Sequence, residues 1–224
     1  MKKFFLNSPL QPDGELKTPI YQVAKDVAGK PQNTRLQMDE AISFPILAAI
    51  NGYVAPNEDF RVIAVVQSLP PALVSEGKMS NAERNYATLC RELDELCKRK
   101  SLRYPEFGVE KISAPANQDI SSHITTFQEL LNYVDDGDEL FACVTYGTKA
   151  MPLIILSAIH YACRLKKNNS IRCVVYGEMD WNVTPPSPTI YDVTALVELD
   201  ELTHKLAELG VSDPRGIIDW ALGL

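Results

Sequence analysis

The residues best suited to bind a ligand follow an apolar stretch, residues 140–144, that has the composition of a strand. A small polar turn, residues 145–149, comes next, and a helical pattern begins directly after it. The first backbone N–H groups of a helix have no partner inside the helix, and after a strand they point out of the edge of the sheet. Gly147 allows a close approach of the backbone to a ligand, Thr148 is expected to cap the helix, and Lys149 adds a cation. This combination predicts a site for a phosphate or another anion.

Further side chains are candidates for the same site. Asn7 and Ser8 follow the first expected strand, and Thr145 and Tyr146 open the turn. Ser8 either orients a ribose or a phosphate group or only begins a turn. Thr145 either lines the site or fills the end of a strand. Tyr146 and Trp181 either stack on a nucleobase or pack at the rim of the fold.

The composition limits the classes of protein to which the chain can belong. It has 224 residues, of which 46% are hydrophobic and 23% are charged, enough for one large domain with a sizeable core. The net charge of −7 argues against binding of a long nucleic acid, which needs a positive surface. No apolar run reaches membrane-spanning length, and the run at 1–6 is too short for a secretory signal. The five cysteines include no Cys-x-x-Cys pair, which favours reduced thiols in a cytoplasmic protein without membrane contact.

Strand and helix patterns alternate along the chain. The expected strands are apolar throughout, which indicates a sheet that is buried on both faces, as parallel sheets are. This alternation predicts an α/β doubly wound fold with a mostly parallel sheet, whose ligands bind outside the carboxyl ends of the strands. Those ends are residues 7–8, 67–68, 145–149 and 177–180. We expect strands at 2–7, 59–67, 107–113, 140–144, 171–176 and 189–192, and a short extended piece at 20–25 inside a long connection, 8–35.

Capping residues set the limits of several helices. Ser80 with Glu83 forms a capping box that begins a helix running to about residue 100. Ser121 or Ser122 is expected to cap a helix through residue 134, and Thr194 a helix to residue 209. Further helices are expected at 38–53 with a bend at the proline, after the 145–149 turn, and from 213 onward, with 68–79 as a loop. We divide the chain into a ligand-binding domain, 1–193, and a small C-terminal helical element, 194–224, that packs on it.

The helix expected after the turn is apolar around nearly its whole circumference. A helix on the outer face of a sheet normally shows a polar stripe, and this one shows none before Lys166. Two explanations are open: the C-terminal helices cover it, or it forms the interface of a homodimer. In a two-fold symmetric dimer of this kind, two copies of the 145–149 turn would form one large anion site.

Residues 145–152, Thr-Tyr-Gly-Thr-Lys-Ala-Met-Pro, resemble the strand–turn–helix motif of CRISPR-associated Rossmann-fold (CARF) proteins. In one branch of that family the motif is Asp-x-Thr-His-Gly-x-Arg-x-x-Pro. Thr145, Gly147 and Pro152 match this motif directly, and Lys149 stands at the basic position. The resemblance implies a Rossmann-like fold.

Two positions depart from the family motif. Cys143 takes the place of the acidic residue, and Tyr146 takes the place of the histidine. Roles that the family gives to those two side chains therefore do not carry over. Residues 190–194 and the Leu- and Glu-rich helix after them also resemble the closing strand and helix of the family.

The resemblance also implies a function. Members of the family dimerise and bind a cyclic oligoadenylate, often the tetra-adenylate ring, as the second messenger of type III CRISPR antiviral signalling. The turn and the loop after the first strand contact the ring, and Asn7 and Ser8 match that loop by position. Some members are ring nucleases that need no metal, because a ribose 2′-hydroxyl attacks the adjacent phosphodiester. Lys149 would stabilise the charge on that phosphate and Ser8 would orient the reacting groups, so these two are the candidate catalytic residues.

Functions of other classes stay open. An enzyme acting on a nucleotide or a sugar phosphate could use the same helix N-terminus, and an interaction protein without catalysis could use the apolar helix to dimerise. No two histidines have metal-ligand spacing and no P-loop pattern occurs, so we expect neither a metal site nor a cofactor. The carboxylates of Glu178 and Asp180 either bind a cation or ribose hydroxyls or lie in a solvated loop.

Overall fold

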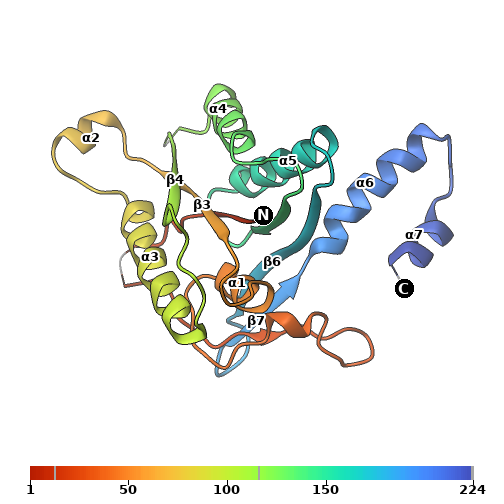
Figure 1. Ribbon diagram of the computed structural model, residues 1–224, viewed down its shortest axis with the longest axis horizontal. Helices are drawn as coiled ribbons and strands as arrows, with labels where there is room; N and C mark the ends of the chain where they lie inside the picture. Colours follow the sequence, from red (N-terminus) through yellow and green to blue (C-terminus); the bar gives the residue numbers. More distant parts are fainter. Residues whose placement is uncertain (13, 116, 223–224) are drawn as a thin grey trace.

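A sheet crosses the centre of the computed structural model, which describes residues 1–12, 14–115 and 117–222 (Figure 1). Its strands are β1 (Lys2–Asn7), β2 (Gln22–Val23), β3 (Phe60–Gln67), β4 (Val109–Ala114), β5 (Glu139–Cys143), β6 (Ser170–Asp180) and β7 (Ser187–Asp192). They lie in the order β2-β7-β6-β5-β1-β3-β4. Neighbouring strands are parallel except for β6 and β7, which are antiparallel.

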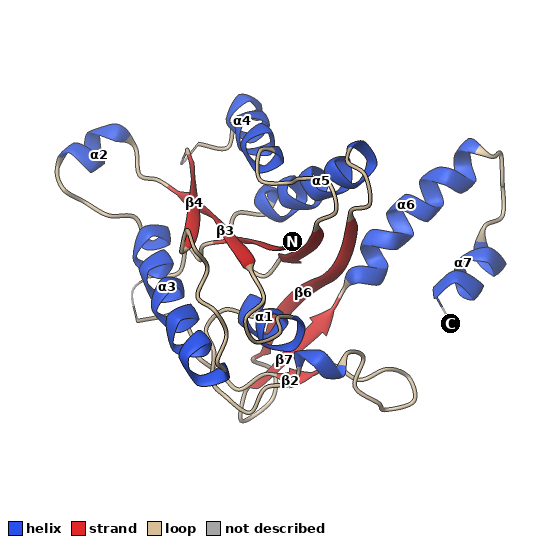
Figure 2. Cartoon of the chain, in the orientation of Figure 1, coloured by secondary structure: helices blue, strands red, loops and turns tan. Residues whose placement is uncertain are grey.

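Helices cover both faces of this sheet (Figure 2). The helices of the described chain are α1 (Ile46–Tyr53), α2 (Pro71–Ser75), α3 (Asn81–Lys100), α4 (Ile120–Leu131), α5 (Ala150–Leu165), α6 (Thr194–Glu208) and α7 (Arg215–Leu222), with a 3-10 turn η1 (Thr34–Leu36). α1 and α3 pack on one face of the sheet, and α4, α5 and α6 pack on the other. The mostly parallel sheet between two helical layers confirms the predicted Rossmann-like α/β fold.

Successive residues of β1 explain why the strands are apolar throughout. Phe4 and Leu6 belong to the core under α1 and α3, whereas Phe5 belongs to the core under α4 and α5. These three side chains are at most 1% exposed. The ring of Phe4 also stacks on that of Phe141 in β5, with the ring centroids 4.4 Å apart. The prediction of a sheet that is buried on both faces is therefore confirmed.

The chain changes direction across the sheet at β1. After β1 the chain forms the two-residue β2 at the far edge of the sheet, then runs through β3 and β4 on one side of β1, and returns to β5 on the other side. The carboxyl ends of β1 and β5 therefore lie side by side, with Leu6 paired to Cys143. This is the topological switch point, where doubly wound sheets bind their ligands.

Some helix boundaries differ from the prediction for local reasons. The helix expected at 38–53 begins only at Ile46, with Pro45 at its N-cap, because the residue before a proline avoids the helical conformation. Asp119 caps α4, and the prediction that Ser121 or Ser122 does so is wrong. The Asp119 carboxylate accepts the N–H of Ser122 at 2.8 Å, which starts the helix earlier than expected.

Two predicted loops contain regular structure. The short helix α2 lies within 68–79, and β6 continues through 177–180, which we expected to follow a strand. β7 explains the length of β6, because its antiparallel pairing supplies hydrogen-bond partners beyond the end of β5. β4 begins at Val109 and not at 107, and α4 ends at Leu131 and not at 134.

Predicted caps have mixed outcomes. The capping box of α3 is confirmed, since the Ser80 hydroxyl accepts the N–H of Glu83 at 3.1 Å. The prediction that Thr194 caps α6 is wrong: Thr194 lies in the first turn, where its hydroxyl donates to Asp192 and accepts the N–H of Val174. α6 packs against β6, and α7 lies next to α6 (Figure 1). The domain boundary before α6 stays a prediction.

α5 has one side that its own chain leaves open. It packs on the sheet and against α4, but Leu153 is 66% exposed, Tyr161 48% and Leu165 63%. The C-terminal helices do not cover these side chains, so burial beneath those helices is the wrong explanation for this side of α5. Of the helices that the structure describes, none is long and apolar enough to span a membrane.

Candidate functional site

The 145–149 turn lies directly against the end of β1. Gly147 has a φ of +102°, a backbone conformation that L side chains adopt only with strain. A Cβ atom at Gly147 would lie 3.0 Å from both Cβ and Cγ of Asn7 and 3.1 Å from Cβ of Met151. Both the conformation and the close contact therefore require glycine, and the backbone of the turn contacts Asn7.

The turn presents backbone donors. Within the described part of the chain, no hydrogen bond takes the backbone N–H of Thr148, Lys149 or Ala150. The Met151 N–H donates to the carbonyl of Thr148 at 3.0 Å, and Pro152 has no N–H, so the open donors precede the regular part of α5. Lys149 is exposed. The turn is therefore accessible to an anion.

The cap of α5 differs from the prediction. Lys149 occupies the N-cap and makes no capping bond through its side chain, so the prediction that Thr148 caps the helix is wrong. The Thr148 hydroxyl oxygen is buried and has no hydrogen-bond partner among the described residues. Lys149 makes no ion pair with any of those residues. Because a cation is unfavourable at the positive end of a helix dipole, the Lys149 ammonium is free to interact with an anion.

Asn7 is buried at this edge without the bonds that burial normally requires. It is 2% exposed, yet neither Nδ2 nor Oδ1 has a partner among the described residues. Leaving such a group unpaired costs about 1–3 kcal/mol, so nearly all buried amides are bonded. Asn7 lines a small cavity beside Gly147 and Met151. Together with the Thr148 hydroxyl, its amide gives this corner buried groups that could donate to a ligand and accept from it.

Ser8 follows Asn7 in the chain, but its hydroxyl is hydrogen-bonded to α3. It is 2% exposed, and its hydroxyl donates to the carbonyl of Ala82 in α3 at 2.6 Å. Its backbone N–H donates to the carbonyl of Val65 at 2.9 Å. In this arrangement Ser8 holds the end of β1 against α3. A catalytic role for its hydroxyl stays a prediction, and that role would require the bond to Ala82 to break.

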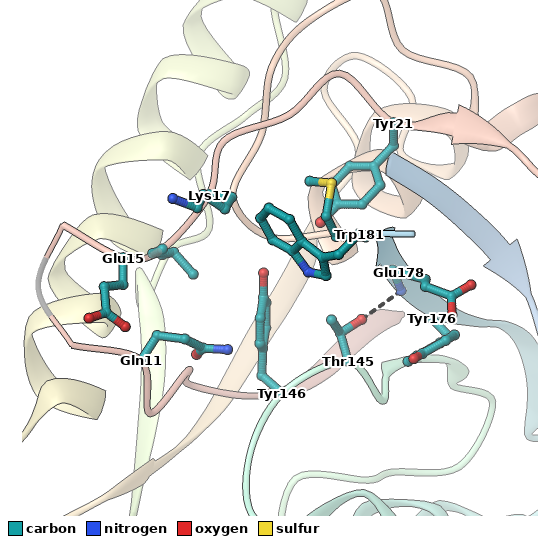
Figure 3. Close-up of a pocket in the computed structure, with 12 residues that line it drawn as sticks. Gln11, Glu15, Lys17, Tyr21, Thr145, Tyr146, Tyr176, Glu178 and Trp181 are labelled. Carbon is teal, nitrogen blue, oxygen red and sulfur yellow. Dashed lines mark hydrogen bonds between the residues drawn. The ribbon is translucent and has the colours of Figure 1, made fainter. Parts of the chain in front are cut away.

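A pocket of about 580 Å³ opens on the other side of the turn (Figure 3). Its walls come from the connection after β1, the turn after β5 and the end of β6. The Thr145 hydroxyl accepts the N–H of Gly177 at 2.8 Å and ties the end of β5 to β6 at the pocket wall (Figure 3). The lining residues are Gln11, Glu15, Leu16, Lys17, Tyr21, Thr145, Tyr146, Tyr176, Gly177, Glu178, Met179 and Trp181.

Hydrogen bonds fix Tyr146 between the turn and α3. Its hydroxyl donates to the carbonyl of Ser43 at 2.7 Å. Ser43 donates its N–H and its hydroxyl to the carboxylate of Glu92 in α3, at 2.9 and 2.6 Å. Burial raises the pKa of Tyr146 above its ordinary value, and burial raises the pKa of Tyr21 to about 12. Both phenols are therefore neutral hydrogen-bonding groups at physiological pH.

The pocket and the turn differ in charge. The pocket wall carries two carboxylates, Glu15 and Glu178, and one ammonium, that of Lys17. Glu178 accepts the hydroxyl of Tyr191 at 2.9 Å. Residues 145–149 carry the Lys149 ammonium and no carboxylate. Electrostatics therefore favour an anionic group at the turn and an uncharged group in the pocket.

Two candidate metal or ribose ligands lie elsewhere than expected. Glu178 and Asp180 belong to β6, so their placement in a loop is wrong, although Glu178 is exposed to solvent as that alternative expected. Among the residues that the structure describes, no three His, Cys, Asp or Glu side chains are grouped so that they could hold a metal ion.

Sequence reasoning found the turn but only part of the pocket. Tyr146 and Trp181 were candidates for stacking on a base, whereas Lys17 and Tyr21 were not singled out. Those two belong to the connection 8–35, and only the fold brings them to the turn after β5. The unusual length of this connection was the available signal, because long connections in compact domains often serve a function.

Comparisons with known proteins add no relative: no protein-family model and no curated protein matches the chain. A functional assignment therefore depends on the geometry of the turn and the pocket.

Proposed function

We propose that the protein binds a cyclic oligoadenylate at the carboxyl edge of its sheet, with the phosphate groups on the 145–149 turn. The observation that carries this proposal is the corner where Asn7 meets Gly147. Open backbone donors, an unpaired ammonium and a buried unpaired amide gather there, at the topological switch point. The resemblance of residues 145–152 to the CARF motif selects the class of ligand, and the tetra-adenylate ring is the first member to test.

The donors at the turn suit a phosphodiester. Its oxygens would accept from the backbone N–H groups of Thr148, Lys149 and Ala150, and the Lys149 ammonium would neutralise its charge. The Asn7 amide is 2% exposed, so it would donate to the same phosphate, or to a ribose oxygen beside it, once the corner beside Gly147 opens for the ligand. Because these groups have no partners among the described residues, a ligand would add hydrogen bonds without breaking existing ones.

A ring of several nucleotides needs more surface than one turn offers. The exposed side of α5 carries Leu153, Tyr161 and Leu165, and α4, which packs against α5, exposes Ile120 at 73% and Ile124 at 49%. Exposed apolar patches of this kind mark interfaces between proteins. We propose that a second copy of the chain covers this patch in a two-fold homodimer, with a turn from each copy contributing to one site.

Ring cleavage is a separate question from ring binding. Attack by a ribose 2′-hydroxyl needs in-line positioning of that group and stabilisation of charge on the phosphate. Lys149 and the open N–H groups of the turn could supply the charge stabilisation. Ser8 is buried and bonded to Ala82, so it does not reach a ligand in this conformation. The proposal is therefore binding, with cleavage as an outcome that the same experiment measures.

A single nucleotide or a sugar phosphate is the second candidate ligand. One observation favours it: residues of this chain alone already enclose a pocket of about 580 Å³ next to the turn. A pocket of this size suits a small molecule without help from a partner. A monomeric enzyme or binding protein could therefore use the same groups.

The experiment is a binding titration without divalent metal. Cyclic tetra-adenylate, cyclic hexa-adenylate and AMP are each titrated into the protein, and linear products are followed by chromatography. Native mass spectrometry measures the oligomeric state. We expect the dimer to bind a cyclic oligoadenylate, and Lys149→Ala to weaken binding about ten-fold or more, the size of a charge-assisted bond.

Lys167→Ala provides the matched control, because Lys167 is an exposed lysine beyond the other end of α5. It should leave the affinity unchanged. Equal effects of the two substitutions would show that only the general charge of the surface matters. Binding of AMP alone would support the second candidate, and no binding to any ring would overturn the proposal.

A further inference from the structure

We infer that the pocket beside the turn seats a nucleobase, with the indole of Trp181 as its stacking surface. This inference rests on the proposed function, because it identifies the group that a phosphate-anchored ligand places next to the turn. The base would bind on a surface formed mainly by the end of β6 and the connection after β1, whereas the phosphate would bind at residues 147–149.

Trp181 is poorly buried for its type. It follows β6, and it is 63% exposed although it is one of only two tryptophans in the chain. Figure 3 shows its indole over the pocket, between the side chains of Tyr146, Tyr21 and Lys17. Large aromatic side chains contribute most when both ring faces are covered, and here one large aromatic surface remains available. A planar base could cover it.

Gly177 lets the backbone of β6 approach Pro45 and Tyr21 closely at the pocket wall. A Cβ atom at Gly177 would lie 2.4 Å from Cγ of Pro45 and 3.2 Å from Cε1 of Tyr21. No larger residue fits there without displacing Pro45. The β6 backbone therefore lies close to Tyr21, and Met179 and Trp181, two and four residues further on, form the rest of that wall.

The charges favour a base over a phosphate in this pocket. Glu15 and Glu178 outnumber Lys17 there, so a phosphate would meet a net negative wall. A purine base is uncharged, and its amino and ring nitrogen groups can pair with carboxylates and hydroxyls. The wall offers both kinds of partner, a carboxylate in Glu178 and phenols in Tyr146 and Tyr21, whose hydroxyls interact with each other while that of Tyr146 donates to Ser43.

The geometry fits one nucleotide that spans both parts of the site. Tyr146 lines the pocket, and the open N–H group of Thr148 lies two residues further along the chain. Two residues span at most about 7 Å between Cα atoms, which is within the reach of one nucleotide from base to phosphate. A phosphate on the turn would therefore carry its own base, or the next one, to the pocket.

Tryptophan fluorescence tests this inference directly. Trp220 in α7 is 83% exposed and lines none of the pocket, so Trp220→Phe leaves Trp181 as the single reporter. Cyclic tetra-adenylate and AMP are each titrated into this variant. Stacking should quench the emission of Trp181 saturably. In the otherwise unchanged protein, Trp181→Ala should weaken binding about ten-fold, as loss of one base-stacking contact does, while Trp220→Ala should not.

The outcomes separate the two proposals. If the ring binds Trp181→Ala with full affinity and leaves Trp181 emission unchanged, the base pocket is refuted and the proposed function stands. If AMP quenches Trp181 but no ring binds, the base pocket stands and the proposed function fails. If no nucleotide changes the emission of Trp181, the inference is wrong. Circular dichroism of Trp181→Ala shows that the variant is folded.

Discussion

Lys3 and Asn7 lie at opposite ends of β1, and they are 1% and 2% exposed, so both polar side chains are buried at an edge of the same sheet. At the amino edge the Lys3 ammonium lies 2.7 Å from the carboxylates of both Asp135 and Asp138. Asp138 also accepts the amino terminus, at 3.2 Å from the nitrogen of Met1. At the carboxyl edge neither polar atom of the Asn7 side chain has a partner among the described residues.

We infer that the amino end of β1 contributes to the stability of the fold, whereas its carboxyl end is available for binding a ligand. Charges that are buried at the amino edge are paired, so they hold the turn at 135–138 to β1. At the carboxyl edge Ser8 is bonded to α3, but the Asn7 amide and the Thr148 hydroxyl are buried without partners among the described residues, at a cost to stability. A ligand site needs such open groups, because a satisfied group must first break a bond before it can bind. The following variants test whether the two edges differ in this way.

Lys3→Met should have the largest effect on stability. It removes the cation between Asp135 and Asp138 and leaves the buried carboxylate of Asp138 with fewer partners. Breaking a buried ion pair costs about 3 kcal/mol or more, which urea unfolding would measure. Lys149→Met, in the exposed lysine of the other edge, should change stability by less than about 0.5 kcal/mol. Equal losses in the two variants would contradict the difference between the edges.

Gly147→Ala should cost about 1–3 kcal/mol, because it adds backbone strain at a φ of +102° and a Cβ contact with Asn7. Gly210→Ala is the matched control. Gly210 also has a positive φ, of +74°, but a Cβ there would meet nothing within 4 Å. The difference in thermal midpoint between the two variants therefore reports the crowding of a Cβ atom against Asn7 and Met151, together with the larger φ of Gly147. A smaller loss for Gly147→Ala than for the control would show that the turn does not pack on β1.

Asn7→Val should increase stability by about 1 kcal/mol while it weakens ligand binding. It replaces an unpaired buried amide with an apolar β-branched residue of similar size in a parallel strand. Urea unfolding and the titration with cyclic tetra-adenylate measure the two effects. A loss of stability would mean that Asn7 has a partner in solution, such as a buried water molecule, and that the carboxyl edge is satisfied after all.

Asp135→Asn should have the smallest effect, and the effect should depend on pH. The hydrogen bond from Lys3 lowers the pKa of Asp135 below its ordinary value. A carboxyl with a lower pKa in the folded state adds stability above its unfolded pKa of about 4, and this stability is lost as the pH falls through the folded value. Because Asp135 is 73% exposed, solvent screening limits the effect to about 0.5 kcal/mol at neutral pH. Urea unfolding at pH 7 and pH 3 should show that the free energies of unfolding of the unaltered protein and of Asp135→Asn become closer in acid. A difference that stays the same at both pH values would contradict this prediction.

Local sequence patterns predicted where helices and strands lie better than they predicted which side-chain hydrogen bonds form. The capping box of Ser80 and Glu83 and the extent of β1 depend on residues that are close in sequence, and both predictions are confirmed. Thr148 and Thr194 were expected to cap helices because threonine often does, but neither does so. For Thr194, the hydroxyl bonds instead to the nearby Asp192 and to the backbone N–H of Val174 in β6, and only the second of these partners is distant in sequence. The helix at 38–53 was extended too far because Pro45 was taken for a bend and not for a start.

The sequence by itself determined the layered α/β fold and the turn between β5 and α5, because apolar periodicity, glycine and proline act through their nearest neighbours. The tertiary structure alone decided that Asn7 is buried without partners, that Ser8 is bonded to α3, and that Lys17, Tyr21 and Trp181 meet in one pocket. The physical reason is the order of the strands. Placing β1 beside β5, and β6 beyond it, sets which side chains meet at the edge, and no pattern within one segment contains that order.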